Sequence, residues 1–283
     1  MSINNSVLVN LIASRSHAEP NCGTFSVTIN DRKYFVKKGN STSLSIFEAE
    51  AEILEEISNL DAISVPKVMT IGIADEFAYL ILEWLDLAPL SYKAAAKLGE
   101  GLSVIHRTTA EQFGWHCDNT IGLTPQINRQ SSEWIDFWKK NRLGFQLKLA
   151  ANNGYVGRLQ ELGQQLLEDC SVLFSGYRPV PSLLHGDLWH GNAACINGDQ
   201  PVIYDPAGYY GDREADLAMA TLFGGFPQSF FSAYEASWPL DAGYQVRREF
   251  YNIYHLLNHL NLFGGSYLHQ TEKAMEAVLS SVR

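Results

Sequence analysis

The sequence is poor in cysteine, in basic residues and in long apolar runs, and each shortage excludes a class of protein. Its four cysteines lie far apart without a C-x-x-C pair, which argues against a zinc ribbon or a disulfide framework and favours a reducing compartment. The 21 lysines and arginines face 31 acidic residues, and a net charge of −10 does not suit a nucleic-acid-binding surface. The most apolar stretch, FAYLILEWL, is interrupted by Glu83 and is too short to span a bilayer. We therefore expect a soluble, cytoplasmic protein that binds neither nucleic acid nor membranes.

The composition is that of a folded protein with a substantial core. Of the 283 residues, 46% are hydrophobic and 18% are charged, which are ordinary values for a globular chain. The first 18 residues have no positively charged start, and Asn10 breaks their apolar run. This segment is therefore predicted to be a first helix rather than a signal peptide.

The hydrophobic pattern predicts an α+β, bilobal fold. Two strands over 24–36 join at an Asn-Asp turn, a helix covers 45–60, and further strands cover 65–73 and 77–82. The pattern after residue 87 predicts helices over 92–106, 132–151 and 155–173, two or three more after residue 216, and a hairpin over 193–205 that turns at Asn197-Gly198. We expect a small β-rich lobe with its hinge over residues 1–86 and a larger, mainly helical lobe over 87–283. Ligands are expected between the two.

The helix predicted over 45–60 carries a glutamate on its apolar side. Glu50 lies between Leu54 and Ile57 in the helical projection, where an unpaired carboxylate would cost several kcal/mol. The preceding strand offers Lys37 and Lys38, which point to opposite faces of the sheet. A lysine on the third strand paired with a glutamate of the next helix is the phosphate-binding arrangement of kinases. A glutamate at the helix rim beside a surface lysine is the alternative.

The stretch LLHGDLWHGN, residues 183–192, can be interpreted in three ways. It is an ordinary polar turn, a metal site built on the H-x-D-x-x-H spacing, or a phosphotransferase catalytic loop. The metal reading uses His185, Asp187 and His190 and could recruit His255 and His259, which are spaced i and i+4 on a predicted helix. These two histidines lie in the aromatic-rich run FYNIYHLLNHLNLF, where packing or contact with the substrate is the alternative.

The catalytic-loop reading explains residues that the other two leave without a role. Asp187 and Asn192 have the D-x-x-x-x-N spacing of a kinase catalytic loop, and Asp205 ends the apolar strand PVIYD. Asp187 is then the base, and Asn192 and Asp205 are oxygen ligands for Mg²⁺ on the phosphates of ATP. With Lys37 and Glu50, five residues in the right chain order fill five roles. We therefore favour this reading.

The nucleotide-binding elements have weaker signals. The stretch LEWLD is apolar enough for its backbone to bind an adenine edge, and this predicts a hinge of Glu83, Trp84, Leu85 and Asp86. The glycine-rich cover of the phosphates is expected between the first two strands, where the candidate EPNCGT contains the single glycine Gly23.

The sequence resembles the fructosamine kinase (ketosamine-3-kinase) family, which is related to the aminoglycoside phosphotransferases. LLHGDLWHGN, VIYDPAGYYGDREADLAMATLFGG and FPQSFFSAY carry the likeness, which extends along essentially the whole chain. The resemblance implies a protein-kinase-like fold and ATP-dependent phosphorylation of the 3-hydroxyl of a ketosamine, either free or on a glycated protein lysine. The 3-phosphate then decomposes spontaneously, so the family acts in deglycation.

The resemblance also assigns roles by position. Asp187 would accept the proton, Asn192 and Asp205 would bind magnesium, and Asp216 would brace the loop. His190 stands where the familiar HGDLWSGN pattern has serine, which leaves the base and the ligands intact. The candidates for contact with the substrate are Trp189, Tyr209, Tyr210, Asp212 and Glu214. The tyrosines and Trp189 are equally well explained as core aromatics, and Arg213 could neutralise one of the acids in a loop salt bridge.

Cys22 lies in the loop predicted to cover the phosphates, and related kinases can carry a cysteine there that forms an intermolecular disulfide. We expect a monomer, with a redox-linked dimer through Cys22 as a hypothesis and an idle surface thiol as the alternative. A nucleotide-binding protein without turnover is the competing functional class, and the complete catalytic set argues against it.

Overall fold

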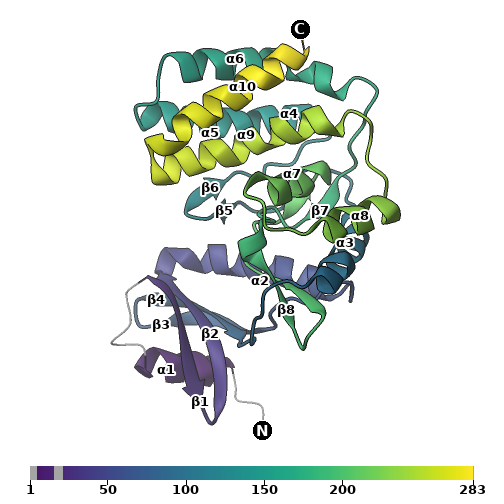
Figure 1. Cartoon of the computed structure of the whole chain (residues 1–283). Helices are drawn as coiled ribbons and strands as arrows, with labels where there is room; N and C mark the ends of the chain where they lie inside the picture. Colours follow the sequence, from purple (N-terminus) through teal and green to yellow (C-terminus); the bar gives the residue numbers. More distant parts are fainter. Residues whose placement is uncertain (1–4, 16–21, 283) are drawn as a thin grey trace.

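A four-stranded antiparallel sheet forms the centre of the N-terminal part (Figure 1). In the computed structural model, which describes residues 5–15 and 22–282, the strands pair in the order β1-β2-β4-β3. They are β1 (Gly23–Ile29), β2 (Arg32–Asn40), β3 (Val68–Ala74) and β4 (Phe77–Glu83). Asn30 and Asp31 connect β1 to β2 with φ angles of 50° and 60°, the left-handed values that a two-residue hairpin turn requires. The predicted hairpin is confirmed.

One helix covers each face of this sheet. Helix α1 (Asn5–Arg15) packs on the face that carries Val36 and Ile81, and α2 (Leu44–Ser58) packs on the face that carries Leu80. Since side chains alternate along a strand, Lys37 points toward α2 and Lys38 points away from it, as predicted. The orientation of the sheet thus brings one lysine to the inner side of α2.

The C-terminal part consists mainly of helices, and four of them pack together at the end of the molecule remote from the sheet (Figure 1). These four are α5 (Gly144–Asn152), α6 (Arg158–Asp169), α9 (Tyr244–Phe263) and α10 (Leu268–Val282). The other four are α3 (Tyr92–Arg107), α4 (Trp134–Trp138), α7 (Glu214–Leu222) and α8 (Gln228–Ser237). The helix predicted over 132–151 is divided into α4 and α5 by a π-helical segment, Lys139–Leu143. The one predicted over 155–173 ends as a 3₁₀ segment, Cys170–Phe174.

The described part of the chain also forms three two-stranded ribbons after β4. They are β5 (Asn119–Ile121) with β6 (Thr124–Gln126), β7 (Ser182–Leu184) with β10 (Tyr209–Gly211), and β8 (Ala193–Ile196) with β9 (Gln200–Ile203). The sequence predicted β8–β9 with its turn at Asn197-Gly198, where φ is 50° and 89°. It did not predict the other two ribbons, because strands of three residues are too short to show an alternating pattern.

Helix α2 belongs to the cores of both parts. Phe47 and Leu54 pack against the sheet, while Ile53 and Ile57 belong to the large hydrophobic cluster of the helical part. The predicted boundary between residues 86 and 87 stays a prediction.

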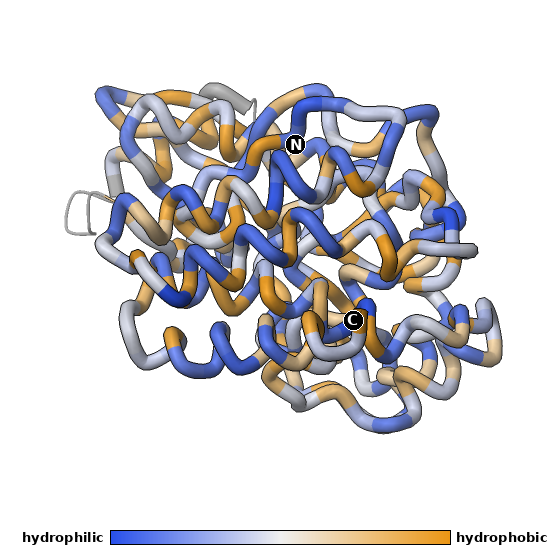
Figure 2. Tube along the Cα trace, turned by 90° about the horizontal axis from the view of Figure 1, so that it is seen from above, coloured by the Kyte–Doolittle hydropathy of each residue, from blue (hydrophilic) through white to orange (hydrophobic). Residues whose placement is uncertain are grey.

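Along the helices, polar and apolar residues alternate (Figure 2). Within the described ranges, the chain forms no helix that has both the length and the apolar character needed to cross a membrane.

Candidate active site

The loop after β7 is held by a buried carboxylate of α7. Asp216 accepts hydrogen bonds from the backbone N–H groups of His185, at 2.7 Å, and Gly186, at 2.8 Å. Gly186 has a φ of 83°, and a Cβ at this position would lie 2.0 Å from the carbonyl oxygen of Ala207. Only glycine fits here. Asp216 is therefore placed to brace the loop, which agrees with its predicted role.

Asp187 and Asn192 face each other across this loop. The Asn192 side-chain amide donates to the backbone oxygen of Asp187 at 2.9 Å and to its carboxylate at 3.2 Å. Burial raises the pKa of Asp187 to about 7, although the hydrogen bond from Asn192 opposes the rise. A carboxylate that titrates near neutral pH has the acidity that suits a general base.

His185 is not free to bind a metal. Its Nδ1 accepts the backbone N–H of Asp187 at 3.3 Å, and its Nε2 lies 3.0 Å from the carbonyl oxygen of Tyr204. Burial lowers the pKa of His185 below its ordinary value. Among the described residues, no metal-ligand cluster includes His185, Asp187 or His190. The metal-site interpretation of LLHGDLWHGN does not fit this arrangement.

Lys37 connects two carboxylates from different parts of the chain. Its Nζ lies 2.7 and 2.8 Å from the two carboxylate oxygens of Glu50 and 2.8 Å from Asp205. Burial alone would lower the pKa of Lys37, but these two carboxylates outweigh it and hold the pKa above its ordinary value. The predicted pair of Lys37 and Glu50 is present, and it is directed at the residue predicted to bind magnesium.

Asp205 is presented on a constrained turn after β9. Its φ of 55° is left-handed, which is uncommon for a residue with a side chain and is found at functional sites. Two side-chain amides hold the residues after this turn. Gln126 donates to the carbonyl oxygen of Ala207 at 2.8 Å, and Asn119 donates to that of Gly208 at 2.9 Å. The side chain of Asp205 remains 47% exposed, so its carboxylate can reach a ligand.

Asn192 and Asp205 together form a donor set that fits Mg²⁺. The nitrogen of the Asn192 amide is turned toward Asp187, and this leaves the amide oxygen for a cation. The backbone N–H of Tyr204 donates to the carbonyl oxygen of Asn192 at 3.1 Å, which keeps Asp205 close to the loop. An amide oxygen and a carboxylate are the hard donors that Mg²⁺ prefers.

The predicted hinge lines an apolar cleft of about 560 Å³ that ends at Asp205. The side chains of the hinge bond within the protein: Glu83 accepts the backbone N–H of Lys67 at 2.8 Å, and Trp84 donates to Asp86 at 2.9 Å. The backbone of the hinge is therefore the part that can bind an adenine edge. A largely apolar cleft of this size accommodates a nucleotide base and ribose.

A second pocket, of about 490 Å³, opens on the other side of the loop, and Asp187 is the one acidic residue that lines it. Its wall is aromatic, with Trp189, Phe223, His259, Phe263 and Tyr267. The sequence named Trp189 as a candidate for substrate contact and gave packing or substrate contact as the alternative for the run that contains His259 and Phe263, but it did not name Phe223 or Tyr267. The available signal was the aromatic run around His259, where Phe263 and Tyr267 follow at helical spacing.

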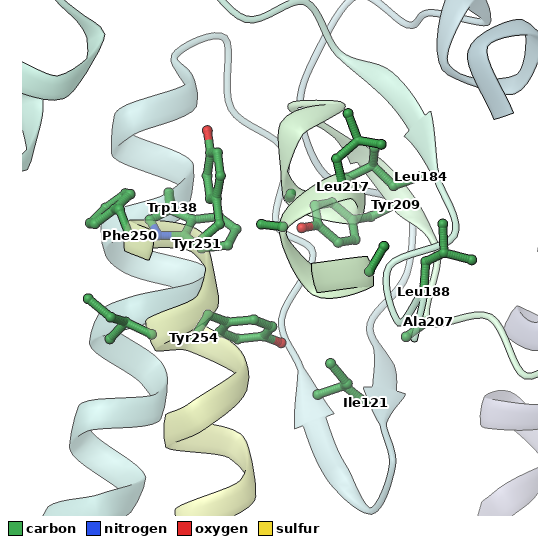
Figure 3. Packing of buried hydrophobic residues seen from close by; sticks show 14 of the residues in the cluster. Ile121, Trp138, Leu184, Leu188, Ala207, Tyr209, Leu217, Phe250, Tyr251 and Tyr254 are labelled. Atoms are coloured by element: carbon green, nitrogen blue, oxygen red, sulfur yellow. The ribbon is translucent and has the colours of Figure 1, made fainter. Parts of the chain in front are cut away.

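Three residues expected to contact the substrate lie in the interior instead. Tyr209 is 2% exposed and packs within the core that Figure 3 shows, 3.9 Å from the Arg142 guanidinium. Asp212 and Glu214 have no exposed surface. Asp212 accepts hydrogen bonds from the half-buried Tyr177 and the buried Tyr251, and Glu214 bonds an arginine of α9. Their burial argues against the substrate roles expected from the sequence.

The remaining candidates lie at the surface or at its edge. Tyr210 donates a hydrogen bond to Glu56 of α2 and stacks on Trp115, so it connects elements rather than lining either cleft. His190 is exposed beside Trp189. Cys22 is exposed, while residues 19–21 of the predicted phosphate loop lie outside the described residues. The expected position of this loop between the first two strands was wrong, because β1 begins at Gly23 and the connection to β2 is Asn30 and Asp31. The redox role of Cys22 stays a prediction.

Sequence comparison identifies relatives along nearly the whole chain. The fructosamine kinase pattern matches residues 16–281. A protein from Synechocystis named as a ketoamine kinase is 41% identical over 250 residues, which are 88% of this chain and 84% of that protein. The chloroplastic protein-ribulosamine 3-kinase of Arabidopsis thaliana is 41% identical over 255 residues, 89% of this chain and 75% of its own length.

Solved structures agree with these relatives. A structure from Thermobifida fusca, described as a fructosamine-3-kinase, has a TM-score of 0.83 at 32% identity and covers 93% of this chain and 91% of its own. An aminoglycoside phosphotransferase in ternary complex with ADP and hygromycin B has a TM-score of 0.64 at 15% identity, with 93% and 91% covered. The second likeness concerns the fold, and it confirms the predicted protein-kinase-like, bilobal architecture.

Proposed function

This chain belongs to the fructosamine kinase family, and we propose that it transfers the γ-phosphoryl group of ATP, with Mg²⁺, to the 3-hydroxyl of a ketosamine. Two clefts support this reaction, since Asp205 lies in the cleft beside the hinge and Asp187 in the aromatic pocket across the loop. A nucleotide and an acceptor would thus meet at these two carboxylates.

Each polar group has a distinct task in the proposed reaction. Asp187 takes the proton of the acceptor hydroxyl as its oxygen bonds to the γ-phosphorus, and the bond from that phosphorus to the bridging oxygen breaks to release ADP. Lys37, held by Glu50, binds the phosphates of the nucleotide. Mg²⁺ held by Asn192 and Asp205 would neutralise the negative charge of the phosphates.

The aromatic pocket favours a small acceptor with few positive charges. Asp187 is the one carboxylate among the residues that line it, and the proposed reaction uses it as the base, so no second acid is available there for the several amines of an aminoglycoside. The pocket therefore has no counterpart of the acidic contact that the sequence placed at Asp212 and Glu214. The 3-phosphate product of a ketosamine is expected to decompose and release the amine, which gives the reaction a role in deglycation of free amines or of protein lysines.

A panel of acceptors tests this function. Ribulosamine, fructosamine and erythrulosamine derivatives are incubated with Mg²⁺–ATP, and transfer of phosphate to the acceptor is measured. We expect transfer to at least one ketosamine and little or none to kanamycin or choline. Robust phosphorylation of kanamycin with none of any ketosamine would refute the proposed substrate and leave the kinase fold in place.

A further inference from the structure

Three side chains of metal-binding type converge at the surface beside α2. They are Glu52 of α2 and the neighbouring residues His116 and Cys117, which precede β5. Their ligand atoms all lie within 4.8 Å of one another, and His116 Nε2 is 2.8 Å from the Glu52 carboxylate. Over residues 5–15 and 22–282, no other group of three or more histidines, cysteines and acids is arranged in this way. The proposed phosphotransfer uses none of the three.

The backbone that carries His116 and Cys117 is fixed on both sides. The N–H of Trp115 donates to the carbonyl oxygen of Asn128 at 3.0 Å, and the Asn128 side chain donates to that of Cys117 at 3.1 Å. The carboxylate of Asp118 accepts the backbone N–H of Asn128 at 2.7 Å. Because the backbone is already held, an ion would not have to order the loop in order to bind.

Helix α2 is also connected to the segment that carries His116 and Cys117 through Glu56, one helical turn after Glu52. Tyr210 stacks on Trp115, with ring centres 5.4 Å apart, and donates a hydrogen bond to Glu56. Glu52 and Glu56 are four residues apart and therefore lie on one face of the helix. These contacts hold the face of α2 that carries Glu52 in place relative to His116.

The electrostatic field at this point favours a cation. The carboxylates of Glu52, Asp118 and Glu48 lie near enough to the Cys117 thiol to act on it electrostatically. They attract a divalent ion, and binding of the ion to the sulfur displaces the thiol proton. The side chains of His116 and Glu52 are 60% and 49% exposed, so they can rotate to approach an ion.

We propose that Glu52, His116 and Cys117 bind one Zn²⁺ ion, with water as the fourth ligand. A thiolate, an imidazole and a carboxylate are the ligands of tetrahedral zinc, whereas Mg²⁺ and Ca²⁺ bind oxygen donors. Small rotations bring the three ligand atoms to the separations of about 3.5 Å that a tetrahedral zinc site requires. Since Glu50 of the same helix bonds Lys37, the ion ties the helix that positions this lysine to the helical part of the protein.

Cobalt titration tests the site directly. Untagged, metal-stripped protein in excess Mg²⁺, which occupies the hard oxygen sites, is titrated with Co²⁺ and followed in the near ultraviolet. We expect a thiolate-to-cobalt absorption band that saturates at one equivalent and disappears when Zn²⁺ is added. Cys117→Ser should abolish the band, and His116→Ala and Glu52→Gln should each weaken Co²⁺ binding at least tenfold.

Matched variants show whether the effect is local. Cys22→Ser removes another exposed cysteine and His269→Ala another exposed histidine, and both should titrate as the wild type does. Thermal melts in EDTA check that every variant is folded before metal is added. No cobalt–thiolate band in the wild type, or a band that survives Cys117→Ser, would overturn the proposal. So would equal binding by the wild type and His116→Ala.

Discussion

The segments 187–205 and 212–216 both contain carboxylate side chains, but these lie at clefts in the first segment and are buried in the second. In the first, Asp187 and Asp205 line clefts, and each has one side-chain partner, Asn192 or Lys37. In the second, the carboxylates of Asp212, Glu214 and Asp216 are at most 1% exposed, and each accepts two or more hydrogen bonds from interior groups. Nearness in the sequence does not give the two segments the same task.

This difference distinguishes carboxylates that can act in catalysis from carboxylates that stabilise the fold. A buried carboxylate with a full set of donors has no free lone pair for a substrate, and its removal leaves those donors unpaired. A carboxylate at a cleft with few donors can accept a proton or bind a cation. Asp216 connects the two classes, because it is buried and yet holds the backbone of the loop that presents Asp187.

The largest expected effect is on catalysis, from Asp187→Asn. The amide keeps the shape of the side chain but cannot accept the proton, so kcat for ketosamine phosphorylation should fall about 10²- to 10⁴-fold. The affinity for Mg²⁺–ATP and the melting temperature should change little, since Asp187 faces the acceptor pocket. Steady-state kinetics and nucleotide titration measure both. Activity within about threefold of the wild type would remove Asp187 from the catalytic class.

Arg247→Met should have the opposite profile, with lost stability and retained chemistry. Arg247 is 2% exposed and donates to both oxygens of Glu214, at 2.7 and 2.9 Å. Removing the arginine leaves a buried carboxylate without its cation, and this should cost about 3–5 kcal/mol of unfolding free energy. Urea denaturation measures the loss, and kcat/KM per folded molecule should stay near the wild-type value.

The double variant Arg247→Met/Glu214→Gln is the control for this prediction. It removes the charge that the single variant leaves unpaired, so part of the lost stability should return. If Glu214→Gln instead keeps full stability and loses affinity for the ketosamine, Glu214 contacts the substrate and the distinction between the two segments fails.

Asp205→Ala tests the exposed member of the first segment. Ligand binding at 100 times Kd stabilises a protein by about 2.7 kcal/mol, and Mg²⁺–ATP should stabilise the wild type on this scale. The variant should lose this stabilisation, as the wild type should when EDTA removes the metal. Asp199→Ala is the matched control, because Asp199 bonds Lys93 at the surface and lines neither cleft. An unchanged thermal shift in Asp205→Ala would place the metal elsewhere.

The sequence predicted those features of the site that depend on local periodicity. The helical projection placed Glu50 on the inner face of α2, and strand alternation left one lysine to meet it. Both inferences are confirmed by the bond from Lys37 to Glu50. The spacing of Asp187 and Asn192 predicted a catalytic loop, and in the structure the two side chains are in hydrogen-bond contact, while their roles stay predictions.

Features that depend on distant partners could not be predicted in this way. YYGDRE looks like an exposed polar loop, yet Asp212 is buried by Tyr177 and Tyr251, which lie 35 and 39 residues away in the sequence. The aromatic pocket likewise combines Trp189 with α9 residues more than 60 positions later. No local pattern records such contacts, so the acids nearest to a motif in sequence were mistaken for its neighbours in space.

The smallest expected effect is on the pH dependence of stability, and it comes from the buried side chain of His255. The buried acids of the second segment have hydrogen-bond partners, whereas one ring nitrogen of this buried base lacks a partner among the described residues. It is 3% exposed, and its Nδ1 has no hydrogen-bond partner in the described part of the chain. Burial, together with the neighbouring His259, lowers the pKa of His255 to about 3.

Because the pKa of His255 is lower in the folded than in the unfolded chain, the unfolded state gains the proton first as the pH falls below about 6.5. The ring therefore contributes stability that is complete above pH 6.5 and is lost progressively as the pH falls toward 3. At pH 5.5 the loss should be roughly 1.4 kcal/mol relative to pH 7.5. Urea unfolding of the wild type and of His255→Gln at pH 7.5, 6.5 and 5.5 isolates this contribution, because His185 and His259 titrate in both proteins. The stability of the variant should fall less steeply than that of the wild type, and parallel curves would mean that His255 accepts a proton inside the folded protein.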